Sequence, residues 1–294
     1  MCTLFRKLYK AIVLMSIIIL FVLTLLMLFG FLDLHQELPE PAESRPSSKQ
    51  HIMPATSYPD KNHLLETEPA QREPICTESL VIEPADTIPI AEYRPVESLE
   101  SLFIGDSRTV GLADYASIEN ATFFATVGMT VYNVWENRVS IPQIGKVTLG
   151  ELLNYKQYDI IYIMLGVNEL GYAFDKTVNH YETLVDSVKS CQPNAVVILM
   201  ANIHVTSQRS ESDKYINNPA IDRFNEATSH LADNKRVFYL DANSLFDDAG
   251  GNLAAEKSAD SAHLKAKYCV EWGDWLVIET ADIILQIEGE KESD

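Results

Sequence analysis

The chain has 294 residues and a net charge of −19, with 42 acidic against 23 basic residues. Arg6, Lys7 and Lys10 precede every acid, so the rest of the chain holds 20 basic and 42 acidic residues. Such a surface is repelled by phosphate backbones, which argues against nucleic-acid binding and against adsorption of the main domain to anionic lipid. The composition also excludes collagenous, coiled-coil and wholly disordered chains.

Residues 11–32 are 22 consecutive residues without a charge. A helix of that length rises about 33 Å, enough to cross a hydrocarbon core of roughly 30 Å. The run is longer than the apolar part of a cleavable signal peptide, and no small-residue cleavage site follows it. We therefore expect an uncleaved single-pass anchor in the cell membrane. The three bases place residues 1–10 in the cytoplasm by the positive-inside rule, with everything after residue 33 outside.

Residues 33–98 contain ten of the thirteen prolines and no glycine. Proline-rich chain favours polyproline II at about 3.1 Å per residue, which predicts a stiff linker reaching up to roughly 200 Å. A reach through a cell wall and a passive tether are both compatible with this composition. We expect the folded domain at 99–288, which is long enough to bury its own core, and an acidic tail at 289–294.

The four cysteines are too widely spaced for a zinc pattern or a CxxC motif: Cys2, Cys76, Cys191 and Cys269. Three of them follow the anchor, which is an odd number. We expect buried free thiols, with one disulfide between Cys76 and a domain cysteine as the alternative. No metal and no organic cofactor is predicted.

Within the domain, short apolar runs rich in branched and aromatic residues alternate with helical patterns. We expect strands at Leu102–Gly105, Thr122–Val127, Ile160–Leu165, Val196–Asn202 and Val237–Leu240. We expect helices over 109–116, 181–192, 221–234 and 264–286. This order is typical of a parallel sheet covered by helices, whose ligands bind beyond the carboxyl ends of the strands.

Three of the predicted strands are followed by residues suited to chemistry. Ser107, in the segment GDSRT, lies at the start of a helix, where free N–H groups and the dipole favour an oxyanion, although serine is also a common helix cap. Gly128 allows the backbone to approach a ligand closely, or simply makes a turn. Asn168 presents an amide at the same edge, or caps the next helix.

The segment DSAHL, before the last helix, places Asp260 three residues ahead of His263. A carboxylate at that spacing can hold an imidazole in one tautomer and stabilise its protonated form, as a serine triad requires. A capping aspartate beside a surface histidine is the alternative. His204 follows the fourth strand and is a possible substrate contact. Arg108 is expected either at the surface or against an anionic substrate.

Taken together in this order, four blocks resemble the SGNH (GDSL) hydrolase family: Gly105-Asp106-Ser107, Gly128, Gly166-Val167-Asn168-Glu169 and Asp260-Ser261-Ala262-His263. The resemblance covers residues 99–288. Together with the expected anchor and linker, it indicates a membrane-anchored bacterial member. It implies a flavodoxin-like three-layer α/β/α fold with a five-stranded parallel sheet.

The resemblance also implies the roles of the site residues. Ser107 is the implied nucleophile, His263 the general base and acid, and Asp260 its orienting partner. The implied oxyanion hole consists of the Ser107 and Gly128 N–H groups and the Asn168 amide.

Asp106 is expected to form hydrogen bonds around the turn that carries Ser107 (the serine turn). Two other positions depart from the pattern of that family. Glu169 stands where Asp is usual, and Ser261 stands where Gly is frequent. Neither position carries an atom assigned to catalysis. HExxH, GxxxxGK[ST], GxGxxG and GxSxG do not occur, which argues against zinc-protease, P-loop, dinucleotide and α/β-hydrolase functions.

The predicted function is an extracytoplasmic serine esterase that removes small acyl groups, foremost acetyl, from cell-envelope or environmental glycans. Four aromatic residues near expected loops fit a glycan but equally fit a core: Tyr132, Trp135, Tyr172 and Tyr215. The first alternative is an O-acetyltransferase acting on a cell-wall polysaccharide, which with one span requires a membrane acyl-donor partner or an external donor. A lysophospholipase or thioesterase, and a non-catalytic glycan-binding module, are the remaining alternatives.

Overall fold

The computed structural model describes residues 98–291. The expected tail at 1–10, anchor at 11–32 and nearly all of the linker lie outside the described residues. Among the residues that are described, none of the helices combines the length and apolar character needed to cross a bilayer.

Five parallel strands form the central sheet in the order β2-β1-β5-β6-β7. They are β1 (Ser101–Gly105), β2 (Ala121–Ala125), β5 (Ile160–Met164), β6 (Val196–Met200) and β7 (Val237–Leu240). This is the doubly wound order of flavodoxin-like sheets. The predicted five-stranded parallel sheet is confirmed, although β2, β5 and β6 end one or two residues earlier than expected.

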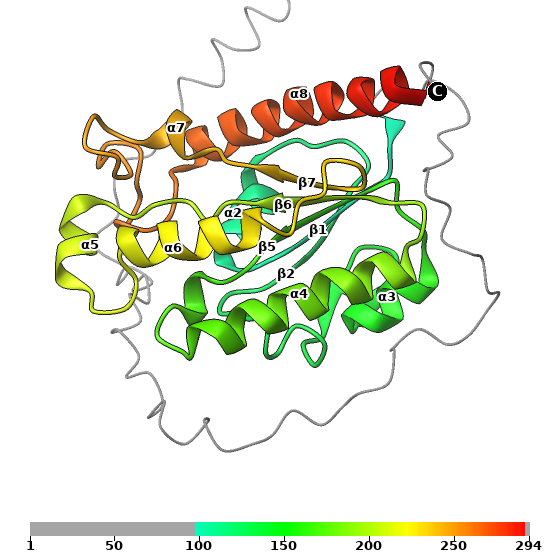
Figure 1. The fold of residues 1–294 in the computed structure, drawn as a ribbon, viewed down its shortest axis with the longest axis horizontal. Helices are drawn as coiled ribbons and strands as arrows, with labels where there is room; N and C mark the ends of the chain where they lie inside the picture. Colours follow the sequence, from blue (N-terminus) through cyan, green and yellow to red (C-terminus); the bar gives the residue numbers. More distant parts are fainter. Residues whose placement is uncertain (1–97, 292–294) are drawn as a thin grey trace, which may run out of the picture. The chain divides into compact units, whose positions relative to one another are not determined.

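Helices cover both faces of this sheet and make three layers. One face packs against α3 (Leu149–Tyr155), α4 (Phe174–Cys191) and α6 (Asn218–Ser229). The other packs against α2 (Ser107–Tyr115), α7 (Asn243–Phe246) and α8 (Ala266–Lys291). Figure 1 shows α8 on one side of the sheet and α3 and α4 on the opposite side.

The sheet has a hydrophobic core on each face, because the side chains of each strand alternate between the two faces. In β1, Leu102 and Ile104 belong to the core beneath α3 and α4, whereas Phe103 belongs to the core beneath α8. Successive strand residues point to opposite faces, so a strand buried on both faces is a nearly continuous apolar run. All five residues of β1, β5 and β6 are buried.

Several short elements were not predicted. The chain between β2 and α3 forms an antiparallel hairpin of β3 (Val139–Ile141) and β4 (Gly145–Val147). After β5 and β6 come the short 3₁₀ helix η3 (Val167–Glu169) and α5 (Ser207–Ser212). Such segments are too short to show a hydrophobic period, so the sequence holds little signal for them.

The two cysteines of the described region differ. Cys269 on α8 is a buried free thiol, as expected. Cys191, the last residue of α4, is disulfide-bonded, so the expectation of a free thiol is wrong there. Its partner is not among the described residues.

Candidate active site

Ser107 is the first residue of α2, immediately beyond the carboxyl end of β1. Asp106 caps this helix by accepting a hydrogen bond from the Arg108 N–H to Oδ1 at 2.9 Å, which confirms its expected structural role. A Cβ on Gly105 would lie 2.9 Å from the Met164 carbonyl oxygen, so only glycine fits before the turn. The Ser107 N–H is therefore one of the first-turn donors that a helix leaves unpaired within itself.

The side chains of Ser107, His263 and Asp260 form a continuous chain of hydrogen bonds. Ser107 Oγ lies 2.8 Å from His263 Nε2, across 156 positions of sequence. Nδ1 of the same ring lies 2.7 Å from Asp260 Oδ2. An ionised carboxylate can only accept, so Nδ1 carries the proton and Nε2 is left to accept from the serine hydroxyl. The structure thus brings the three expected triad residues together.

Asp260 also organises the loop that carries His263. Its Oδ1 accepts the N–H groups of Ala262 at 3.1 Å and His263 at 2.9 Å. The hydrogen bond with the His263 ring, aided by these N–H groups, holds the pKa of Asp260 well below its ordinary value even though partial burial acts to raise it. The turn places Ser261 at a φ of 75°, in the left-handed region. That conformation explains why glycine suits this position.

The expected oxyanion donors come from three neighbouring parts of the structure. Gly128 is exposed after β2, with a φ of 75°. Asn168 Nδ2 donates to the carbonyl oxygen of Met129, the residue after Gly128, at 3.1 Å. The same nitrogen lies 3.5 Å from Asp106 Oδ2. The Asn168 amide therefore lies between the loop of Gly128 and the cap of the helix that starts with Ser107.

A family model described as the GDSL-like Lipase/Acylhydrolase family matches residues 103–267. The chain belongs to this family. As a GDSL-like acylhydrolase, it is an enzyme that hydrolyses ester bonds. Among curated proteins, a search found no match to the chain.

The GDSL-like acylhydrolase is also similar to solved structures. One is a protein from Streptococcus pneumonia described in connection with platelet activating factor, at 21% identity, 62% coverage of this chain, 81% of the other and a TM-score of 0.49. Another is an acetyl xylan esterase, at 14% identity, 62% and 99% coverage and a TM-score of 0.46. A third is a carbohydrate acetylesterase from Sinorhizobium meliloti, at 16% identity, 63% and 99% coverage and a TM-score of 0.42.

Glu169, the first departure from the family pattern, is buried beside the site of this acylhydrolase. Its Oε1 accepts the Val131 N–H at 2.6 Å, while Oε2 has no hydrogen-bond partner among the described residues. Burial raises the pKa of Glu169 to about 8, with the nearby Asp106 charge adding to the effect. In this enzyme the Glu169 side chain joins the segment 166–169 to the loop after β2.

The expected surface position of Arg108 is wrong. The residue is only 6% exposed, and its Nε donates to the Ala262 carbonyl oxygen at 3.3 Å. Burial lowers the pKa of Arg108, while the charges of Asp106 and Asp260 act to raise it. In this acylhydrolase, Arg108 thus lies beneath the loop that presents His263.

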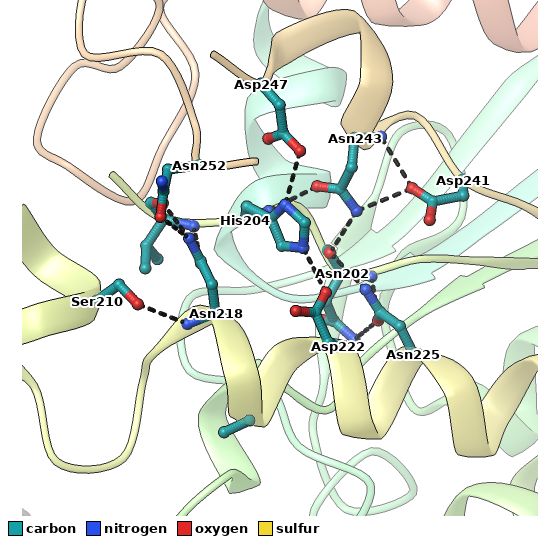
Figure 2. Close-up of polar contacts among 12 residues, drawn as sticks. Asn202, His204, Ser210, Asn218, Asp222, Asn225, Asp241, Asn243, Asp247 and Asn252 are labelled. Carbon is teal, nitrogen blue, oxygen red and sulfur yellow. Dashed lines mark hydrogen bonds and ion pairs between the residues drawn. The ribbon is translucent and has the colours of Figure 1, made fainter. Parts of the chain in front are cut away.

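His204, the second expected substrate contact, has both ring nitrogens engaged. Nδ1 lies 2.8 Å from Asp247 Oδ2 and Nε2 lies 2.8 Å from Asp222 Oδ1, as Figure 2 shows. The structure assigns no hydrogen bond between this ring and the triad within the described residues. Contact between His204 and a substrate therefore stays a prediction.

In the described part of the chain, no cluster of His, Cys, Asp or Glu side chains is suited to a metal.

The four aromatic residues considered for glycan binding differ in how far they are buried. Tyr132 and Trp135 pack against the core, and Tyr132 stacks on Tyr172 with ring centroids 5.4 Å apart. Tyr215 is 36% exposed. Tyr215 is the one exposed residue of the four, and Lys214 Nζ lies 5.1 Å from its ring centroid, so the aromatic residues give little support to a glycan.

A set of buried asparagines near the site was missed by the sequence analysis (Figure 2). Asn225 accepts the Asn202 N–H at 2.8 Å and donates to the Asn202 carbonyl oxygen at 2.9 Å. Asn218 makes the same pair of bonds with Val205, at 2.8 and 2.9 Å. Asn218 and Asn225 lie seven residues apart, on one buried face of α6. The two asparagines share this buried face with Ile221 and Phe224, and that pattern was the available signal.

Proposed function

We propose that this ester hydrolase is a serine esterase in which Ser107, His263 and Asp260 form the catalytic triad. The hydrogen-bonded series from Ser107 Oγ through the imidazole to Asp260 is the observation that carries the proposal. As Oγ attacks the ester carbonyl carbon, Nε2 takes the hydroxyl proton. Asp260 holds Nδ1–H and stabilises the imidazolium that results.

The tetrahedral intermediate places a negative charge on the former carbonyl oxygen. We assign its stabilisation to the N–H groups of Ser107 and Gly128 and to the Asn168 amide. Collapse of the intermediate breaks the bond to the alcohol, which leaves with the proton from Nε2. Water then attacks the acyl-Ser107 ester with His263 again as base, which releases the acid and restores the serine.

The proposed substrates are small acyl esters, foremost acetyl, on cell-envelope or environmental glycans. Supporting this choice are the charge-free run at 11–32 and the proline-rich segment 33–98, which favour a domain anchored to the cell membrane and held outside it. The acidic composition fits a neutral or basic polymer better than a polyanion.

An O-acetyltransferase is the second candidate, because the same acyl-Ser107 can pass its acyl group to a sugar hydroxyl in place of water. The side chains of His263 and Asp260 are 41% and 56% exposed, which leaves the site open to a bulky acceptor. With one membrane span, such an enzyme needs a separate partner or an external acyl donor.

The test is acetate release by the full chain in detergent from aryl acetates and acetylated glycans. We expect turnover that is faster for acetyl than for longer acyl groups, and a loss of roughly 10³-fold or more in Ser107→Ala and His263→Ala. Ser140→Ala, at the exposed middle position of β3, is the matched control and keeps full activity. An active Ser107→Ala enzyme excludes the triad. Acetyl gain by a glycan oligomer without ester turnover favours the transferase.

A further inference from the structure

Two consecutive residues at the start of α2 contact two consecutive residues of the loop before α8. Ser107 Oγ meets His263 Nε2 at 2.8 Å, and Arg108 Nε donates to the Ala262 carbonyl oxygen at 3.3 Å. The second contact is adjacent to the first on both chain segments. The Arg108–Ala262 hydrogen bond holds the loop to α2 one residue away from the Ser107–His263 contact. It therefore limits how far Ser107 Oγ and His263 Nε2 can move apart.

The Ala262 carbonyl is one of three successive acceptors in this loop. The Ser261 carbonyl accepts the Thr206 N–H at 3.0 Å, and the His263 carbonyl accepts the Ala259 N–H at 2.8 Å. Neither of these bonds involves α2. Among the hydrogen bonds that these three carbonyls accept from described residues, only that of Arg108 joins the loop to the helix that carries Ser107.

The Arg108 side chain is enclosed by protein. It is 6% exposed, and its Nη1 is buried without a hydrogen-bond partner among the described residues. The burial of Nη1 closes this nitrogen to a substrate anion, which argues against the anionic-substrate role considered from the sequence. The side chain adjoins the cavity between α2 and α8 that Ser107 and His263 also line.

The charge of Arg108 is matched to its surroundings. Asp106, whose carboxylate caps α2, and Asp260, which holds His263, both attract the guanidinium. A guanidinium keeps its charge even when buried, and its interaction with carboxylates is stronger in a low-dielectric interior. One buried cation thus lies in the field of both the helix cap and the orienting carboxylate.

We propose that Arg108 is a positioning residue, which sets the approach of His263 to Ser107 by fixing the Ala262 carbonyl to α2. The role rests on the proposed function of the triad. A displacement of about 1 Å at reacting atoms can cost on the order of 10²-fold in rate. Loss of the arginine therefore lowers the rate of the chemical step, while substrate binding is retained.

Arg236 supplies a matched control. Its Nη2 donates to the carbonyls of Lys189 at 2.8 Å and Gln192 at 2.7 Å, and its Nε donates to that of Ala195 at 3.3 Å. This arginine therefore binds carbonyls as Arg108 does, but at the amino end of β6, away from the carboxyl ends that carry the site.

The test uses the full chain, with kinetics on an aryl acetate and covalent labelling by a fluorophosphonate, which reports the reactivity of Ser107 directly. In Arg108→Met we expect kcat and the labelling rate to fall together by about 10- to 100-fold, with KM within about twofold of wild type. Arg236→Met lowers Tm and leaves both rates unchanged. Arg108→Lys keeps the charge without the planar fork, so it folds with a Tm near wild type and recovers part of the rate.

Wild-type kcat and labelling in Arg108→Met overturn the positioning role. A raised KM with unchanged kcat also overturns it, because that result makes Arg108 a substrate contact. If Arg108→Met does not fold, Arg108→Lys decides, and full labelling of that variant counts against the proposal. A wild-type enzyme that neither turns over the ester nor takes the label overturns the proposed function, and this inference with it.

Discussion

At the scale of single residues, the serine turn is surrounded by three buried ionisable side chains. Asp106 and Glu169 are fully buried acids, and burial raises the pKa of both. Arg108 is a buried cation, and the charge of Asp106 attracts it. The same Asp106 charge disfavours a second negative charge on Glu169, which agrees with the raised pKa of Glu169.

This raised pKa predicts a pH-dependent stability. A glutamate whose pKa rises from 4.5 to about 8 on folding binds its proton more tightly in the folded state than in the unfolded chain. The free energy of unfolding therefore has its full Glu169 contribution below pH 4.5 and loses it as the pH rises towards 8. Urea unfolding at several pH values measures this slope. Glu169→Gln should flatten it, whereas Glu182→Gln, on the exposed face of α4, should leave it unchanged. Equal slopes in wild type and Glu169→Gln contradict the assignment.

Asn168 offers a second residue-scale prediction. As one of the proposed oxyanion donors, its replacement by alanine should lower kcat by roughly 10²–10³-fold, with a smaller change in KM. Steady-state kinetics on an aryl acetate measures both. Asn137→Ala is the control, since its Nδ2 also donates to a backbone carbonyl, that of Asn133 at 3.0 Å, but outside the serine turn. An unchanged kcat in Asn168→Ala removes this amide from the oxyanion hole.

At the scale of elements, the segment after β6 is held by side-chain amides in place of a neighbouring strand. Asn218 and Asn225 of α6 each pair with both the N–H and the carbonyl of one residue, as a strand does. Asn243 of α7 adds bonds to the His204 N–H and the Asn202 carbonyl. The segment ends at Thr206, whose N–H holds the Ser261 carbonyl, so the asparagines support the triad loop indirectly.

This arrangement predicts that Asn225→Ala is destabilising out of proportion to its size. The change leaves the buried Asn202 N–H without its partner, at a cost of about 1–3 kcal/mol. Urea unfolding measures the loss. Asn154→Ala is the control, because that exposed amide bonds only within α3, to the Gly150 carbonyl at 2.9 Å. Equal stabilities of the two variants contradict the supporting role.

At the scale of the whole molecule, the prediction concerns the anchor, which lies outside the described residues. The 22-residue uncharged run should hold the full chain in the membrane fraction through carbonate extraction, because its burial in hydrocarbon needs no charge pairing. Removal of residues 1–32 should release a soluble esterase with unchanged kcat. Protease added to intact cells should digest the domain if it faces outward. A full chain that remains in the supernatant contradicts the anchor.

Local patterns in the sequence were sufficient for the sheet and for the candidate triad residues that the structure brings together. The strands could be predicted because β1, β5 and β6 are buried on both faces and so are mostly apolar on both. The hairpin of β3 and β4 could not, because three-residue strands carry no measurable period. The sequence also left open whether Cys191 forms a disulfide, since cysteine spacing does not specify pairing.

The sequence by itself determined the α/β alternation, and it also placed Ser107, Gly128, Asn168, Asp260 and His263 at the ends of predicted elements. Both are properties of residues close together along the chain. Only the tertiary structure decided that Arg108 is buried against Ala262, that His204 lies between Asp222 and Asp247, and that Glu169 reaches Val131. Each of these contacts joins residues 18 or more positions apart, and burial of a charged side chain depends on what the fold packs over it rather than on its neighbours in sequence.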